Sequence, residues 1–177
     1  MQQDQKPAVS RALKRLRMLV GEYVWGVRRG ADDVLSLEFG PPHLAVQEPL
    51  PLAPDATRTV ADVLGRRVVE PTGKWHLFVE DGDWAIVTGS HGTRRFDTDP
   101  ARAAAALRQL DGQRLRSVDY LPGTVSWHLR FDLGGSLTIN RSTPLDEARS
   151  AESVWILFSE GGAWFALRND MRAAHKP

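Results

Sequence analysis

The chain carries one pattern of residues twice, and this internal duplication constrains its fold more than any other feature. In each half, a Leu-x-Gly motif follows an amphipathic segment and precedes an alternating run of apolar and polar residues. The pairs that lie 91 residues apart are Leu16 and Leu107, Leu19 and Leu110, Gly21 and Gly112, and Val27 and Val118. The pairs that lie 80 residues apart are Trp75 and Trp155, and Trp84 and Trp164. We therefore expect two copies of one folding unit, with the change of spacing absorbed between residues 47 and 74.

Each copy is predicted to consist of a helix, three strands, a short helix and two strands. A five-stranded unit with one apolar face is marginal alone, so the two units should bury these faces together. The predicted fold class is α+β, a pseudo-symmetric single domain with mainly antiparallel sheet. The first unit is assigned to residues 8–97 and the second to 98–170, between a disordered tail at 1–7 and a frayed C-terminus at 171–177. The tryptophans should be core anchors; the alternative is an aromatic platform on which bases or sugars stack.

Hydrophobic periodicity and turn residues place the elements of the first unit. Apolar residues three or four apart predict a helix over 8–18, and alternation predicts a strand over 34–39. Gly40-Pro41-Pro42 is predicted to turn the chain into a further strand, and the prolines of 47–54 exclude a helix and a central strand there. The remaining expected features are strands at 23–28 and 43–46, a helix at 55–64, a turn at 71–73 and a mobile connector at 89–92.

A hairpin is predicted near the end of each unit. In the first unit, Asp81-Gly82 separates the apolar runs 75–80 and 84–88 and is the strongest hairpin signal in the chain. In the second unit, residues 160–162 join the strands 155–159 and 164–168. Two helices are expected. One runs to Leu110 with Thr98 or Asp99 as its cap and Pro100 in its first turn, and the other covers 143–150 with Thr143 as its cap and Pro144 at its first position.

Composition excludes several classes of protein. Cysteine is absent, which excludes disulfides, thiol nucleophiles and thiolate metal sites. The formal net charge of +1 provides no global field that would concentrate nucleic acid or anionic lipid. The N-terminus lacks the apolar core of a signal peptide, and no apolar run approaches the length of a membrane span. We expect a cytoplasmic protein whose partner is neither membrane nor nucleic acid.

No motif in the chain predicts chemistry, so no catalytic residue, metal or cofactor is expected. The five histidines form no pair with the spacing of metal ligands. One segment favours a different view: Ser90 and His91 stand between glycines, with Arg94 and Arg95 close behind, and backbone N–H groups of such loops can hold anions. Because the chain has neither a phosphate loop nor a nucleophile elbow, a plain linker is the stronger interpretation of this segment.

A partner-binding surface is expected where the two copies differ. The segment 47–70 has no counterpart of equal length in the second copy, and Arg66 and Arg67 are its expected polar anchors. The acidic segment 80–83 is the second choice, although hairpin tips are commonly acidic for solubility alone. The residues assigned to this surface are Glu48, Asp55, Arg58, Arg66, Arg67, Glu80, Asp81 and Asp83.

The repeated pattern resembles the small, β-rich immunity-type proteins of bacterial polymorphic toxin and contact-inhibition systems. The residues that carry the resemblance are Leu110, Gly112, Leu115, Val118, Leu129, Phe131, Leu137, Ile139, Trp155 and Leu157. The resemblance spans most of the chain, and the first copy departs from it at Trp25-Gly26 and in the proline-rich segment. It implies a cytoplasmic protein that binds and blocks a cognate toxin, and it carries no catalytic residues.

The predicted function is therefore that of a non-enzymatic binding protein, an immunity protein that blocks a toxin by steric occlusion. Two alternatives stay open. One is a small-ligand-binding or self-associating module whose site is the cleft between the two units; a homodimer through an edge strand is also compatible with the sequence. The other is an enzyme that acts through the Ser90-His91 loop on an anionic substrate, with Arg94 or Arg95 as the anion-binding group.

Overall fold

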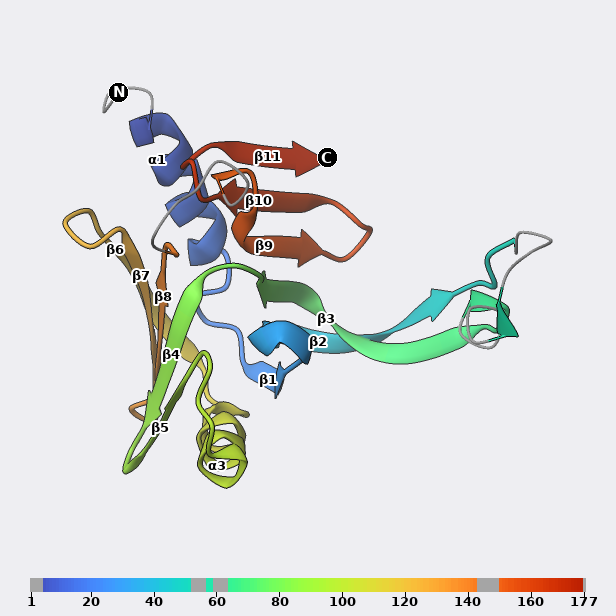
Figure 1. Ribbon diagram of the computed structural model, residues 1–177, viewed down its shortest axis with the longest axis horizontal. Coiled ribbons are helices and arrows are strands. Elements are labelled where there is room, and N and C mark those ends of the chain that lie inside the picture. The colour runs from blue at the N-terminus through green and yellow to red at the C-terminus, as the bar shows by residue number, and fades with distance from the viewer. Residues whose placement is uncertain (1–4, 52–56, 59–63, 143–149, 177) are drawn as a thin grey trace.

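The computed structural model describes residues 5–51, 57–58, 64–142 and 150–176, and within them it contains two antiparallel sheets and two α-helices (Figure 1). The elements are α1 (Gln5–Arg17), β1 (Val24–Arg29), the 3-10 turn η1 (Ala31–Asp33), β2 (Leu35–Gln47), β3 (Val68–Val79), β4 (Asp83–Thr88), β5 (His91–Arg94), α3 (Pro100–Leu110), β6 (Leu115–Leu121), β7 (Ser126–Phe131), β8 (Ser136–Asn140), β9 (Ser153–Ser159), β10 (Trp164–Arg168) and β11 (Ala173–Lys176). The predicted α+β class with mainly antiparallel sheet is confirmed.

Each copy of the duplicated unit contributes strands to both sheets. The six-stranded sheet has the order β1-β2-β3-β9-β10-β11, and the five-stranded sheet has the order β5-β4-β8-β7-β6. The first three strands of the first copy (β1–β3) therefore share a sheet with the last three strands of the second (β9–β11). In the other sheet, the first three strands of the second copy (β6–β8) join the last two of the first (β4 and β5). The two copies are interleaved, and each sheet joins them at one seam, β3 with β9 and β8 with β4.

Reciprocal backbone hydrogen bonds confirm that the duplication is structural. Two such bonds are Gly21 N–H to Leu115 O (2.9 Å) and Gly112 N–H to Val24 O (2.8 Å). In the first bond the donor lies in the first copy and the acceptor in the second, and in the second bond this is reversed. Gly112 is 91 residues after Gly21, and Leu115 is 91 residues after Val24, which is the spacing found in the sequence. Tyr23 and Arg114, which are also 91 residues apart, form a single β-bridge between the copies. An approximate two-fold axis therefore passes between Tyr23 and Arg114.

One hydrophobic core joins both sheets, and a helix closes it at either end. Helix α1 contacts β6 and β10, while α3 contacts β5, β4 and β1, so each helix spans from one sheet to the other (Figure 1). The core includes the fully buried side chains of Trp84, Trp127 and Trp155. The rings of Trp127 and Trp155 meet edge to face with centroids 6.3 Å apart, a favourable aromatic geometry. These three tryptophans are core anchors, as predicted.

The hairpin predicted at Asp81-Gly82 is wrong, because the chain changes sheets there. Strand β3 pairs with β2 and β9, whereas β4 pairs with β5 and β8. The N–H groups of Asp81 and Gly82 donate to Ser153 O and Val154 O at 3.0 and 3.1 Å, which fixes the crossing against the start of β9. A Cβ on Gly82 would lie 2.8 Å from Val154 O. Glycine is needed here for close packing, and the sequence gives the same signal as a tight turn.

The turns predicted at 40–42 and 71–73 are also wrong, because β2 and β3 continue through them as one long antiparallel pair. Phe39 pairs with Trp75 and Pro42 pairs with Gly73, so two residues of β2 stand opposite the single residue Lys74. This is the arrangement of a β-bulge, which bends a strand without ending it. The segment 43–46 is thus the outer part of β2, and the third strand of the first copy is β3.

Strand pairing also corrects the predicted equivalence of the tryptophans. In the two sheets, the corresponding pairs are Ile86 with Leu137 and Leu157 with Leu77. Ile86 and Leu157 therefore occupy equivalent positions. Trp84 lies two residues before Ile86 and Trp155 lies two residues before Leu157, so these two tryptophans are counterparts. The spacing of 80 residues, which matched Trp75 to Trp155, reflects similar apolar patterns in strands that are not equivalent.

The two ends of the chain are more ordered than predicted. Residues 173–176, expected to fray, form β11 and pair with β10. Helix α1 begins at Gln5, inside the expected tail, and residues 1–4 lie outside the described part of the chain. The helices predicted at 55–64 and 143–150 fall mostly outside it as well.

Two other predictions are confirmed. Helix α3 has Asp99 as its N-cap, with the carboxylate accepting from the N–H groups of Ala101 and Arg102 at 3.1 and 3.0 Å. Strands β9 and β10 form the predicted hairpin.

Candidate functional site

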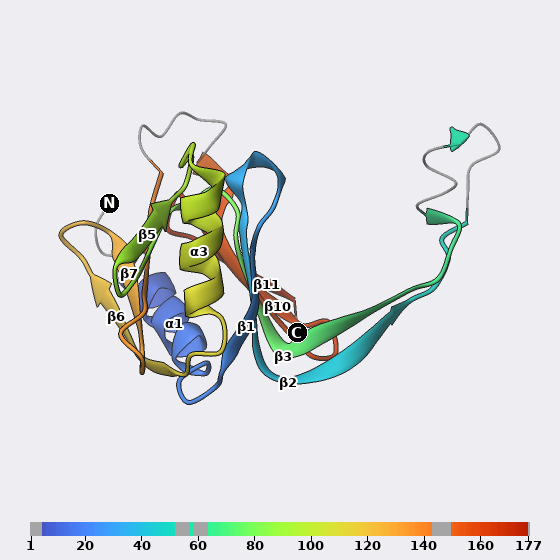
Figure 2. The same ribbon diagram turned by 90° about the horizontal axis from the view of Figure 1, so that it is seen from below.

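The outer halves of β2 and β3 project from the body as a two-stranded ribbon (Figure 2). We define the arm as residues 41–47 of β2 and 68–73 of β3. The equivalent strands of the second copy, β7 and β8, are joined directly by residues 132–135. The arm is therefore the main difference between the two copies in the described part of the chain. The segment 47–70, where the sequence predicted a partner-binding surface, overlaps the arm only at residues 47 and 68–70.

One face of the arm is an apolar stripe exposed to solvent. Leu44 pairs with Pro71 and Val46 pairs with Val69, and alternation places these two cross-strand pairs on the same face. Leu44, Val46 and Val69 are 70%, 54% and 51% exposed. The opposite face is half-buried near the body, where His43, Ala45 and Thr72 line a cavity of about 200 Å³ together with the β9–β10 loop. The stripe is thus the uncovered side of the arm.

The free edges of the arm are poor templates for a further strand. Strand β1 pairs with β2 only as far as Phe39, and β9 pairs with β3 only from Trp75 inward. Prolines occur on both arm strands, at Pro41, Pro42 and Pro71. Proline offers no N–H to an added strand, and edge prolines commonly prevent sheet extension. The exposed apolar face of the arm, and not its edges, is therefore the surface available for contact.

A buried carboxylate fixes the root of the arm. Glu38 is 2% exposed, and its Oε2 accepts a hydrogen bond from Gly73 N–H at 2.9 Å, at the bulge. Nearby, the indole Nε1 of Trp25 donates to Gly40 O at 2.8 Å. These bonds hold the bulged strand on both sides, so the direction of the arm is set by the body.

His76 belongs to the same polar network. Its Nε2 lies 2.8 Å from Ser36 Oγ, and its Nδ1 lies 3.8 Å from Glu38 Oε1. Burial lowers the pKa of His76 below its ordinary value; the Glu38 carboxylate opposes this effect, and the Arg28 guanidinium adds to it. His76 is accordingly neutral in the folded protein at pH 7.

We expect the protein to lose stability as the pH falls below about 6.5, the pKa of an unfolded histidine. In that range the unfolded chain binds a proton that folded His76 does not, so protonation favours unfolding until the lower folded pKa is passed. Thermal melts at pH 7.5 and 5.5 should show a smaller loss for His76→Gln than for the wild type. NMR titration of His76 with a midpoint at or above 6.5 would contradict the assignment.

The predicted anchors of the 47–70 segment are exposed, and one pair is formed. Arg67 donates through Nε to Glu48 Oε2 at 2.9 Å, and both side chains are 61% exposed. Such an exposed pair contributes little to stability. Arg58 and Arg66 are exposed. Asp55 lies outside the described residues.

The acidic segment 80–83 does not form one surface. Glu80 and Asp83 are exposed, but Asp81 is 6% exposed and its carboxylate accepts a hydrogen bond from Asn169 Nδ2 at 2.6 Å. The prediction that Asp81 meets a partner is wrong, because the sheet crossing carries this side chain into the protein. Its role is structural.

The Ser90-His91 segment is part of a hairpin, so the predicted mobile connector is wrong. Thr88 pairs with His91, which leaves Gly89 and Ser90 as the turn between β4 and β5. Arg94 is exposed, whereas the Arg95 guanidinium donates to Gly82 O at 3.1 Å and lies 3.7 Å from Asp81 Oδ1. Arg95 is thus committed to the sheet crossing, and the four residues do not assemble into one anion site.

The residues that make the stripe were not predicted from the sequence. Their signal was present as short apolar alternations, Leu44-x-Val46 and Val69-x-Pro71, on either side of the proline-rich segment. Without knowledge that β2 and β3 run past the body, each alternation predicts an ordinary strand with one buried face.

No group of three or more His, Asp or Glu side chains placed to hold a metal ion occurs among the residues that the structure describes. Within the same residues, no helix combines the length and apolar character needed to cross a membrane. Comparison with protein families, curated proteins and solved structures finds no match for this chain.

Proposed function

We propose that this chain is a non-enzymatic binding protein that holds a folded protein partner with the apolar stripe of its arm. The observation that carries the proposal is the exposure of Leu44, Val46 and Val69 on a ribbon that the body holds at a fixed direction. Exposed apolar surface of this kind typically marks an interaction site. An isolated two-stranded ribbon is also marginal in water, so packing against a partner stabilises it.

The charge of the arm region favours a protein partner over nucleic acid. Between residues 41 and 74, four basic side chains are matched by four acidic ones. A surface without net positive charge gains little from releasing counterions from a phosphate backbone. Apolar contact is then the main source of affinity, which suits a folded protein with a complementary apolar groove.

We further propose that the partner is a bacterial toxin, which the bound chain blocks by covering its active surface. This specific form is supported by the resemblance of the repeated pattern to immunity-type proteins. A rigid body with one projecting arm suits steric occlusion, because the arm adds contact area beyond the body without any chemistry of its own.

The test is affinity capture with matched arm variants. Val46→Glu places a charge on the stripe and should weaken partner retention about 10- to 100-fold, because an unpaired carboxylate is costly to bury. Gln47→Glu, on the adjacent residue of the opposite face, is the control and should retain the partner. Equal retention by both variants would exclude the stripe as the binding surface.

A deletion with an internal template gives a second test. Residues 40–74 can be replaced by Asp-Leu-Gly, the sequence of residues 132–134, because the strand pairing makes Phe39 and Trp75 the counterparts of Phe131 and Gly135 in the second copy. We expect a folded body that no longer retains the partner. The toxin assignment requires a further result: the captured protein should arrest growth when it is produced alone, and should not when it is produced together with the wild-type chain. A captured protein that does not arrest growth would contradict the immunity function but would still support the binding function.

A further inference from the structure

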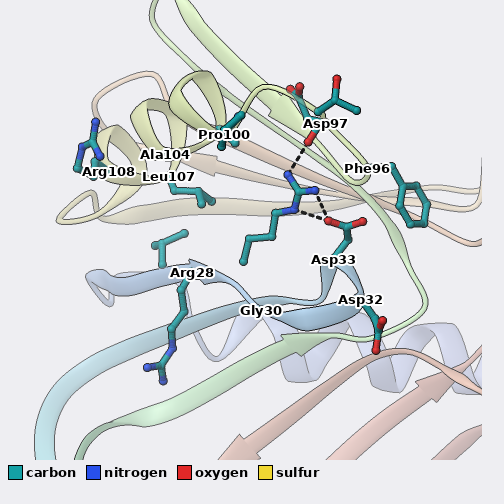
Figure 3. A pocket seen from close by; sticks show the side chains of 14 residues that line it. Arg28, Gly30, Asp32, Asp33, Phe96, Asp97, Pro100, Ala104, Leu107 and Arg108 are labelled. Carbon is teal, nitrogen blue, oxygen red and sulfur yellow. Dashed lines mark hydrogen bonds and ion pairs between the residues drawn. The ribbon is translucent and has the colours of Figure 1, made fainter.

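A groove of about 1040 Å³ lies between α3 and the segment 27–33, and none of its lining residues belongs to the arm (Figure 3). Its apolar lining includes Val27, Ala104 and Leu107. Asp33 and Asp97 lie at one end of the groove and Arg108 at the other.

Two residues beside the groove have counterparts in the other copy through the internal symmetry of the chain. Arg29 pairs with Leu35 in β2, and Tyr120 pairs with Trp127 in β7, so Arg29 and Tyr120 occupy equivalent positions 91 residues apart. The same spacing makes Leu13 of α1 the counterpart of Ala104 of α3. Leu13 and Tyr120 are half-buried and pack against the core, and the centroids of the Tyr120 and Trp127 rings lie 5.1 Å apart. At these two positions, one copy has a leucine and a tyrosine that pack against the core, and the other has an alanine and an arginine beside the groove.

The polar end of the groove is fixed in place. The Arg29 guanidinium forms an ion pair with Asp33 and donates from Nη1 to Asp97 O at 2.8 Å (Figure 3). Asp32 and Phe96 both have positive φ, 54° and 61°, and Phe96 is 64% exposed. Non-glycine residues in this conformation are strained, and such strain is concentrated at binding sites. The end wall is therefore preorganised.

We propose that this groove binds a short segment of a protein partner, which places a leucine-sized apolar side chain on Val27, Ala104 and Leu107. The size of that side chain is inferred from Leu13, which fills the equivalent position in the other copy. Arg108 is exposed at the end of the groove opposite Asp97, whereas the Arg28 side chain points away from the groove and its Nη2 lies 3.8 Å from Glu38 Oε1 (Figure 3). A carboxylate next to the apolar side chain is then favoured at that end. The proposal rests on the groove alone and is independent of the arm.

The test uses N-acetyl-leucine amide as the probe, titrated into the isotope-labelled protein and followed by NMR. Backbone signals of residues 27–33 and 96–108 should shift. N-acetyl-alanine amide, which has a methyl group in place of the leucine side chain, should leave them unchanged. Ala104→Leu restores the residue of the other copy, and it should weaken probe binding at least tenfold while the protein melts at no lower temperature. Absence of shifts in the wild type, or equal shifts in Ala104→Leu, would overturn the proposal.

A second variant tests the charge preference independently. N-acetyl-leucine, with a free carboxylate, should bind more tightly than its amide to the wild type. Arg108→Gln should remove this difference and leave binding of the amide unchanged. If the carboxylate gives no advantage in the wild type, or keeps it in Arg108→Gln, the charged end of the groove does not recognise the ligand as proposed.

Discussion

Replacement of Asp81 with alanine is expected to lower the free energy of unfolding by about 3–5 kcal/mol, the usual cost of removing one partner of a buried ion pair. The Asp81 carboxylate accepts from Asn169 at 2.6 Å and lies 3.7 Å from the Arg95 guanidinium, whose side chain is only 9% exposed. Without Asp81, a positive charge stays buried beside the sheet crossing. The backbone oxygen of Asp81 also accepts from Ser142, so the same residue connects segments that follow β3, β5, β8 and β10.

Denaturant unfolding followed by circular dichroism measures this effect. Glu80→Ala, at the exposed neighbouring residue, is the control and should change stability by less than about 0.5 kcal/mol. If Asp81→Ala were no more destabilising than Glu80→Ala, the carboxylate would not stabilise the crossing.

Replacement of Gly73 with alanine is expected to cost about 3 kcal/mol, at the upper end of the range for overpacking. A Cβ at this position would lie 2.7 Å from Phe39 O and 2.8 Å from Phe39 N. Both are backbone atoms of the paired strand, so the contact is relieved only by opening the β2–β3 ladder at the bulge. This movement would also disturb the bond from Gly73 N–H to Glu38 and change the direction of the arm.

Gly123→Ala is the matched control for this substitution, because a Cβ on Gly123 meets nothing within 4 Å. Thermal and denaturant unfolding should separate the two variants clearly. A Gly73→Ala protein as stable as Gly123→Ala would mean that the arm root yields easily and does not hold the arm in one direction.

The duplication and most strand positions were predictable because they follow from local patterns. Leu-x-Gly follows each helix, and alternation along 34–39 and 127–131 locates two of the strands, although β2 is buried on both faces over 35–40. The Asp99 cap and the β9–β10 hairpin are likewise encoded within a few residues. Such signals depend only on residues that are close in the sequence, so they predict the same helix or strand whatever the order of strands in the sheet.

The failures share a different physical cause, since each depends on residues far away along the chain. Asp81-Gly82 indicates a bend but cannot tell whether the next strand returns to β3 or joins β8. Likewise, Gly40-Pro41-Pro42 is compatible with a turn or a bulge, and only the partner strand decides between them. The apolar stripe was missed for the same reason, because burial of a strand face depends on what packs against it.

The interleaved strand order has a consequence for how the protein folds. Strands β1, β2 and β3 obtain their sheet neighbour β9 from more than 70 residues away, and β4 obtains β8 across about 50 residues. Neither copy can complete a sheet before the other is present, so the halves are expected to gain and lose structure in one cooperative step. Pairing of strands so far apart along the chain also requires long loops to close, and the entropy lost in that step is compensated only when the strands have paired. We therefore expect slow folding for a domain of this size. Although the chain contains two similar copies, they are therefore expected to fold and unfold together in a single transition and not as independent units.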